Sequence, residues 1–102
     1  MINKPHSTDR MCVRYDIVEC ERFSLRYELI KRKNSDYTLF AEYLYDLMVT
    51  KMPHGSHSEE SAVIPAVSSM YERAADMYEC MCRNTVTPMC VAEFFEEYNS
   101  CM

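Results

Sequence analysis

The sequence has little glycine and no long apolar run. Only one of its 102 residues is Gly and four are Pro, which excludes a glycine-rich phosphate-binding loop. No stretch approaches the roughly 20 apolar residues that a membrane-spanning helix requires, and the polar first residues do not resemble a signal peptide. Because 48% of the residues are hydrophobic, the chain can form one folded domain, which we expect to be cytoplasmic.

Cysteine, unlike glycine, is well represented, with six residues at positions 12, 20, 80, 82, 90 and 101. Without a secretory leader we expect reduced, buried thiols rather than disulfides. A zinc site at Cys80 and Cys82 is disfavoured, because side chains two apart on a helix point roughly 200° away from each other. We therefore expect no metal and no cofactor.

The charge differs between the two parts of the chain. Residues 1–36 hold eight Lys and Arg against six acids, whereas residues 37–102 hold three against ten. The one basic run, Lys31-Arg32-Lys33, lies in a chain with a net charge of −5. Nucleic-acid binding is therefore not expected.

Catalysis is not expected either, because a cysteine nucleophile needs a well-placed histidine. His6 lies in the polar N-terminal stretch, and His54 and His57 lie in a Ser-rich stretch. The acids of the last predicted helix (Glu93, Glu96 and Glu97) read as its solvent-facing side rather than as a catalytic pair. We predict that the chain is not an enzyme.

Helical periodicity is clearest from residue 35 onward. It predicts a helix over 35–52, whose apolar stripe consists of Phe40, Tyr43, Leu44, Leu47 and Met48. Proline, glycine and serine then predict a flexible loop over 53–63.

Residues 64–102 predict two further helices. The first begins after Pro65 and runs to about Arg83, and Thr87 and Pro88 mark a new start as N-cap and first helical position. The apolar residues of the last helix are Val91, Phe94, Phe95 and Tyr98.

The first third of the chain fits two structures. Apolar residues alternate with polar ones around residues 13–17 and 23–29, as in a β-hairpin, yet Phe23, Tyr27 and Ile30 also have helical spacing. With three helical segments downstream we favour helix over the hairpin. The expected fold class is all-α, a single helical domain over residues 1–102.

The predicted helices resemble those of the Bcl-2 family of apoptosis regulators. The fourth homology motif of that family is similar to Leu39-Phe40-Ala41-Glu42-Tyr43-Leu44, and its corner between helices is similar to Val86-Thr87-Pro88. A second register aligns residues 67–78 with the third homology motif, but it requires a deletion, so we favour the ungapped one. The chain lacks the Asn-Trp-Gly-Arg motif and the central helix of the family. Residues 11–33, which are extra relative to the family, could fill the space of that helix.

The resemblance implies a fold like the N-terminal half of a Bcl-2 protein and a function as an inhibitor of apoptosis. It implies a shortened member of the family, as compact viral members are expected to be. Its partners would be pro-apoptotic helices, and recruitment to mitochondria would occur through them. The groove positions that it implies are Arg73, Met77, Cys80, Met81, Tyr98 and Met102, with Arg73 meeting an acidic group of the ligand. The alternative is a helical interaction or homodimerisation module unrelated to apoptosis.

Overall fold

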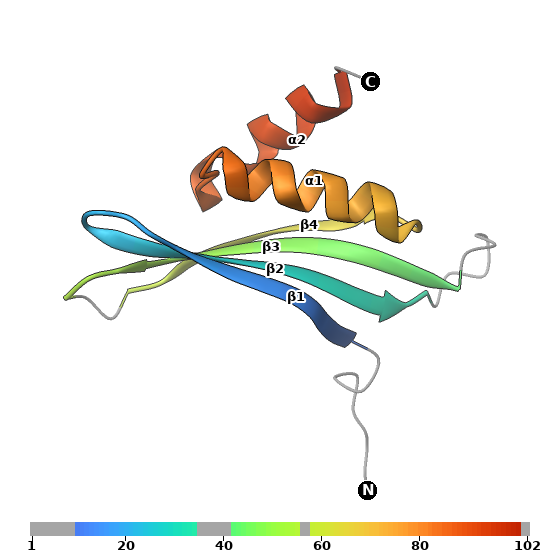
Figure 1. The fold of residues 1–102 in the computed structure, drawn as a ribbon, viewed down its shortest axis with the longest axis horizontal. Coiled ribbons are helices and arrows are strands. Elements are labelled where there is room, and N and C mark those ends of the chain that lie inside the picture. Colours follow the sequence, from blue (N-terminus) through green and yellow to red (C-terminus); the bar gives the residue numbers. More distant parts are fainter. Residues whose placement is uncertain (1–9, 35–41, 56–57, 101–102) are drawn as a thin grey trace, which may run out of the picture.

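The computed structural model describes residues 10–34, 42–55 and 58–100. These residues form one four-stranded antiparallel sheet followed by two helices on the same side of it (Figure 1). The strands lie side by side in chain order, so consecutive strands are neighbours. Their bounds are Arg10–Glu19 for β1, Phe23–Lys33 for β2, Tyr43–Pro53 for β3 and Glu60–Ser68 for β4.

The all-α prediction is therefore wrong. The expected helical bundle needed a helix over 35–52, but its described part, from Tyr43 onward, is strand β3. The loop expected over 53–63 is shorter, because β4 begins at Glu60. The chain does not have the fold of the N-terminal half of a Bcl-2 protein.

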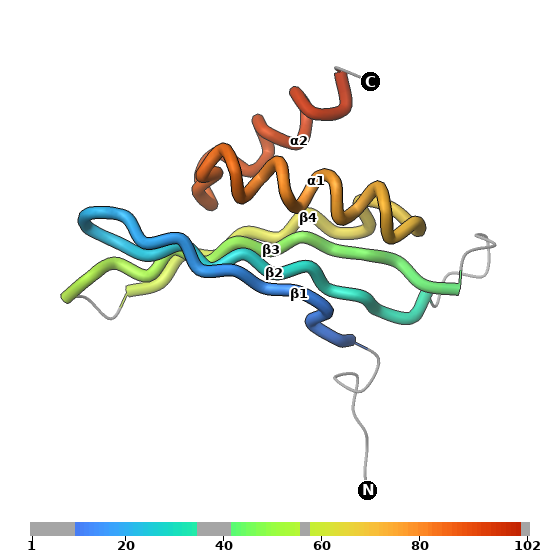
Figure 2. Tube along the Cα trace, in the orientation of Figure 1, coloured from blue at the N-terminus to red at the C-terminus, as the bar shows by residue number. Residues whose placement is uncertain are grey.

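The first third of the chain is the hairpin that we ranked second. The backbone N–H of Cys20 donates to the carbonyl of Phe23 over 2.8 Å and closes a tight turn between β1 and β2 (Figure 2). From this turn the register runs through Val18 opposite Leu25 and Asp16 opposite Tyr27. The alternation of apolar and polar residues was thus the true signal, and the helical spacing was coincidental.

Strand β3 was mistaken for a helix because both of its faces contain buried residues. Leu47 and Val49 are fully buried on one face, and Leu44 and Asp46 are buried on the other. A central strand buried on both sides reads as a nearly continuous apolar run. In such a run, apolar residues also occur at i, i+3, i+4 and i+7 by chance.

The core lies between α1 and one face of the sheet, which we call the covered face. The sheet contributes alternate side chains of β2 and β3 to it, among them Leu25, Tyr27 and Leu47, none of which is exposed. Helix α1, Tyr71–Arg83, covers them with its own buried residues Ala74, Met77, Tyr78 and Met81. We call the opposite side of the sheet the open face.

The two C-terminal helices confirm the predicted periodicity after residue 70. Helix α1 is followed by a short 3-10 helix, η2, at Pro88–Cys90 and by α2 at Val91–Ser100. Thr87 and Pro88 hold the predicted N-cap and first helical positions, although no side-chain hydrogen bond caps η2. Pro65 does not start a helix, since it lies in β4. Among the described residues, no helix is long and apolar enough to cross a membrane.

Candidate protein-binding groove

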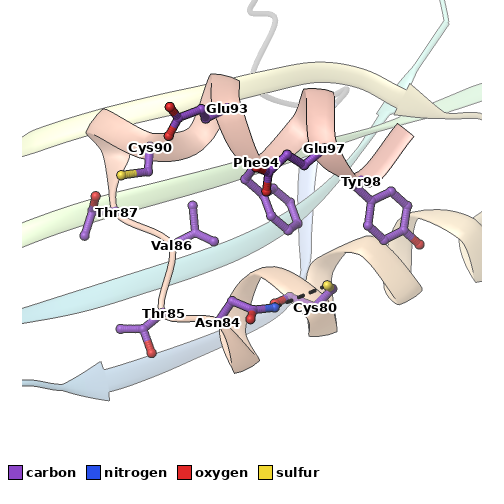
Figure 3. Close-up of a pocket in the computed structure, with 10 residues that line it drawn as sticks. All are labelled: Cys80, Asn84, Thr85, Val86, Thr87, Cys90, Glu93, Phe94, Glu97 and Tyr98. Atoms are coloured by element: carbon purple, nitrogen blue, oxygen red, sulfur yellow. Dashed lines mark hydrogen bonds between the residues drawn. The ribbon is translucent and has the colours of Figure 1, made fainter. Parts of the chain in front are cut away.

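A groove of about 630 Å³ separates the C-terminal half of α1 from α2. We call it the α1–α2 groove. Figure 3 shows Phe94 and Tyr98 projecting from α2 toward the side of α1 that carries Cys80. The residues that line the groove are Cys80, Asn84, Thr85, Val86, Thr87, Cys90, Glu93, Phe94, Glu97 and Tyr98.

The apolar part of this groove is built from both helices and the corner between them. The rings of Phe94 and Tyr98 lie one helical turn apart on α2, with their centroids 6.0 Å apart. Both side chains are half-buried, whereas Val86 in the corner is buried. Half-buried aromatic rings beside a buried aliphatic residue form a surface that can accept apolar side chains of a partner.

The closed end of the groove is the corner that joins α1 to η2. The N–H of Val86 donates to the carbonyl of Met81 over 3.2 Å, and the N–H of Thr85 donates to the carbonyl of Cys82 over 3.1 Å. This is the bonding of a helix end that usually carries glycine, yet Thr85 occupies it with a φ of 51°. The hydroxyl of Tyr27 in β2 donates to the carbonyl of Val86 over 2.9 Å, which holds the corner against the sheet.

The other end of the groove is braced by a hydrogen bond between the two helices. The hydroxyl of Tyr98 on α2 donates to the carboxylate of Asp76 on α1 over 3.1 Å. Burial and this carboxylate raise the pKa of Tyr98, and the nearby charge of Arg73 partly offsets the increase. Tyr98 therefore stays a neutral hydrogen-bond donor at neutral pH and fixes the spacing of α1 and α2.

The electrostatic character of the groove is acidic. Glu93 and Glu97 lie one turn apart on α2 and both line the groove, and the described lining contains no basic residue. Helix α2 as a whole holds three glutamates and no Lys or Arg. With the half-buried rings beside them, these glutamates suit an apolar ligand that also carries positive charge.

Only some of the residues predicted to form a groove line the α1–α2 groove. Cys80 and Tyr98 do line the α1–α2 groove, although they belong to a fold different from the one that suggested them. Met77 and Met81 point into the core instead and are 3% and 0% exposed. The same apolar stripe that made α1 recognisable packs against the sheet.

The two other predicted residues lie elsewhere. Arg73 is exposed on α1 and close enough to influence Tyr98, but it does not line the groove. Met102 lies outside the described residues.

Sequence analysis missed several residues that line the groove, among them Phe94, Glu93 and Glu97. Phe94 was named only as one of the apolar residues of the last helix, and the glutamates were assigned to its solvent-facing side. The available signal was the spacing of Phe94 and Tyr98, four residues apart, directly after the Thr87-Pro88 corner. Which side of α2 turns toward α1 depended on the path of that corner.

A second cluster of polar side chains joins β1 to α1. The hydroxyl of Tyr78 donates to the carboxylate of Asp16 over 2.7 Å, and the guanidinium of Arg14 lies 5.0 Å from the centre of the Tyr78 ring. Burial raises the pKa of Tyr78 and of Cys82 beside it, which favours the neutral hydroxyl and the neutral thiol. These contacts connect the edge strand β1 to the helix that covers the sheet.

Across residues 10–34, 42–55 and 58–100, no three His, Cys, Asp or Glu side chains gather closely enough to hold a metal ion. The predictions that the chain needs no cofactor and is not an enzyme stay predictions.

Comparison with known proteins places the chain in a family. The model of a family described as "Family of unknown function (DUF6514)" matches residues 7–100. No curated protein and no solved structure matches the chain. The matched range contains the complete sheet, both helices and the α1–α2 groove. The chain belongs to this family, DUF6514, whose function is unknown.

Proposed function

We propose that this chain is a protein-binding domain whose α1–α2 groove takes a basic amphipathic helix of a partner. The observation that carries the proposal is the lining of the groove. It combines the half-buried rings of Phe94 and Tyr98 with the carboxylates of Glu93 and Glu97, and its described residues include no Lys or Arg. Apolar anchors beside one sign of charge are the usual elements of helix-in-groove recognition.

The walls of the groove support the proposal because they are fixed before a ligand arrives. Met77, Tyr78 and Met81 bury α1 against the sheet. The hydrogen bonds from Tyr98 to Asp76 and from Tyr27 to Val86 hold α2 and the corner. A preformed groove loses little conformational entropy on binding, so more of the contact free energy appears as affinity.

The charge of the groove selects the chemistry of the occupant. The carboxylates of Glu93 and Glu97 attract Lys or Arg side chains, which would flank the apolar residues that contact Phe94 and Tyr98. An acidic or purely apolar helix would leave these carboxylates without a partner. The expected ligand is therefore a helix with one apolar face bordered by basic residues.

The anti-apoptotic activity implied by the Bcl-2 resemblance stays a prediction. The motif similar to the first helix of that family ends in strand β3, so the groove of that family would not be built from the same elements. The binding proposed here depends on the α1–α2 groove alone.

The experiment is calorimetric titration of the full chain with a model peptide. The peptide is about four helical turns long, with Leu at helical spacing and Lys elsewhere. A second peptide has Glu in place of every Lys. We expect binding of the basic peptide only, and weakening of about tenfold, or 1.4 kcal/mol, when Glu93→Lys and Glu97→Lys are combined.

Glu96→Lys is the control for charge, to be compared with Glu93→Lys alone, because each of these substitutions changes the net charge by the same two units. Glu96 is exposed on the same helix but does not line the groove, so this substitution should change the affinity by less than about twofold. Equal binding of both peptides would contradict the proposal. So would an effect of Glu96→Lys as large as that of a groove glutamate.

A further inference from the structure

The two edges of the sheet are protected to different degrees. Edge strand β4 contains Pro65 and a register shift, with Ala66 at a φ of 52°, and both α2 and η2 pack against it. Edge strand β1 contains no proline, and within the described residues it pairs with β2 alone. Proline and irregular backbone prevent strand pairing, so β1 is the edge available to a partner.

Strand β1 is also unusually apolar for an exposed edge. Met11, Tyr15 and Ile17 are 62%, 59% and 52% exposed. A long edge strand that exposes apolar side chains and unpaired backbone groups is a template for another strand.

The hydrogen-bonding phase of β1 can be derived from its turn. Cys20 bonds to Phe23, and bonded pairs in an antiparallel ladder occur at every second residue. Val18, Asp16 and Arg14 therefore direct their backbone groups toward β2. The intervening Ile17 and Tyr15 direct theirs to the free edge.

Opposite charges flank Tyr15 on β1. Arg14 precedes it and Asp16 follows it, so an antiparallel copy of the same strand centred on Tyr15 places each Arg14 opposite an Asp16 of the other copy. The neighbouring in-phase registers, centred on Arg14 or Asp16, place like charges opposite each other, which is destabilising. The irregularity of β1, between Cys12 and Arg14, lies just outside the three central pairs.

Both charged side chains remain available for this pairing. Arg14 contacts Asp16 of its own strand over 3.6 Å and Glu79 of α1 over 3.0 Å. Asp16 also accepts a hydrogen bond from the hydroxyl of Tyr78 over 2.7 Å. The side chains nevertheless stay 39% exposed for Arg14 and 49% exposed for Asp16.

We infer that the chain forms a homodimer in which the two β1 strands pair antiparallel about Tyr15 and join the two sheets into one. The contact is isologous, because the same strand is used by both copies and Arg14 and Asp16 form two equivalent pairs across the axis. This dimer uses the side of the molecule marked by β1 and leaves the α1–α2 groove accessible.

The first experiment is the mass of the full chain in solution by sedimentation equilibrium. We expect twice the 12.1 kDa of one chain and a monomer for Tyr15→Pro. The N–H that this proline removes points to the free edge at the centre of the proposed contact, so the β1–β2 ladder is retained. Tyr15→Phe keeps the N–H and the ring, and it should remain a dimer.

The second experiment exchanges charges and does not depend on the proline variant folding. Arg14→Asp alone places acids opposite Asp16, and Asp16→Arg alone places bases opposite Arg14, so each variant should be monomeric. Mixed together, they restore two opposite-charge pairs, and we expect a heterodimer. Circular dichroism verifies that each variant is folded.

The outcomes separate this arrangement from others. A wild-type monomer at all attainable concentrations would overturn it, and so would a dimer that persists in a folded Tyr15→Pro variant. A mixture of the charge variants that stays monomeric would also refute pairing about Tyr15. Peptide titration of the groove reads a different surface, so either proposal can fail without the other.

Discussion

The two faces of the sheet are stabilised by different physics. On the covered face, Leu25, Tyr27 and Leu47 are completely buried beneath α1, and the stabilisation comes from apolar burial. On the open face the best-buried charged residue is Asp46, at 3% exposed. Its carboxylate accepts hydrogen bonds from Arg32 at 2.8 Å and from the N–H of Ala66 at 2.7 Å.

One sheet thus obtains its stability and its register from different interactions. Apolar burial contributes most of the free energy but is non-directional. The Asp46 carboxylate connects β3 to β2 through Arg32 and to the irregular part of β4 through Ala66. It therefore specifies which residues of three strands lie beside each other, at a position that helix packing does not reach.

The most destabilising substitution should be at Leu47, compared with its neighbour Met48 on the opposite face of β3. Leu47→Ala removes a fully buried side chain beneath α1 and should lower the free energy of unfolding by roughly 4 kcal/mol. Met48→Ala truncates a half-buried side chain on the open face and should lower the free energy of unfolding by about 1 kcal/mol or less. Urea unfolding measures both, and equal losses would show that the faces are not distinct.

The second effect tests the charged residue of the open face. Asp46→Asn keeps the shape of the side chain but leaves Arg32 without its carboxylate, which should cost roughly 3 kcal/mol for a buried ion pair. Glu28→Gln makes the same chemical change on the same face, where Glu28 lies 3.8 Å from the 45%-exposed Arg26. That variant should lose less than about 1 kcal/mol. If the two losses matched in thermal unfolding, Asp46 would be no more than a surface charge.

The smallest effect concerns the hydroxyl of Tyr78 on the covered face. Tyr78→Phe removes its hydrogen bonds to Asp16 and to the carbonyl of Tyr27 and should cost about 1.5 kcal/mol at pH 7. Tyr15→Phe, on the open face at 59% exposed, should stay within about 0.5 kcal/mol of the wild type.

The same variant has a pH dependence of defined sign. Burial raises the pKa of Tyr78 in the folded chain, so its neutral hydroxyl stabilises the fold fully below the unfolded tyrosine pKa of about 10. That contribution is lost as the pH rises through the folded pKa. Tyr78→Phe should therefore show a shallower loss of stability above about pH 10 than the wild type. Identical slopes would mean that Tyr78 ionises as easily folded as unfolded.

Sequence reasoning succeeded where an element has one buried side and one exposed side. Helix α1 buries one side and exposes the other, so its periodicity was readable, and Pro88 marked the start of the next helical segment. It failed for β3, which has buried residues on both faces. It also failed for the β1–β2 hairpin, because the alternation there was outweighed by the helices expected downstream.

The candidate groove was predictable only in part. Cys80 and Tyr98 were identified, but Met77 and Met81 were assigned to the groove although they form the core. A periodic pattern tells which residues share a side of a helix, but it does not tell what lies opposite that side. Here the sheet lies opposite the apolar stripe of α1, and α2 lies beside it.

The sequence alone was enough to predict the two C-terminal helices and the start at Thr87-Pro88, because helical periodicity and the fixed φ of proline act locally. It also contained the alternation of the hairpin and the opposite charges on either side of Tyr15. That residues 43–53 are a strand, and which side of α2 turns toward α1, could be seen only in the folded chain. These features depend on contacts between segments distant in the chain, such as Asp46 with Ala66 and Tyr27 with Val86.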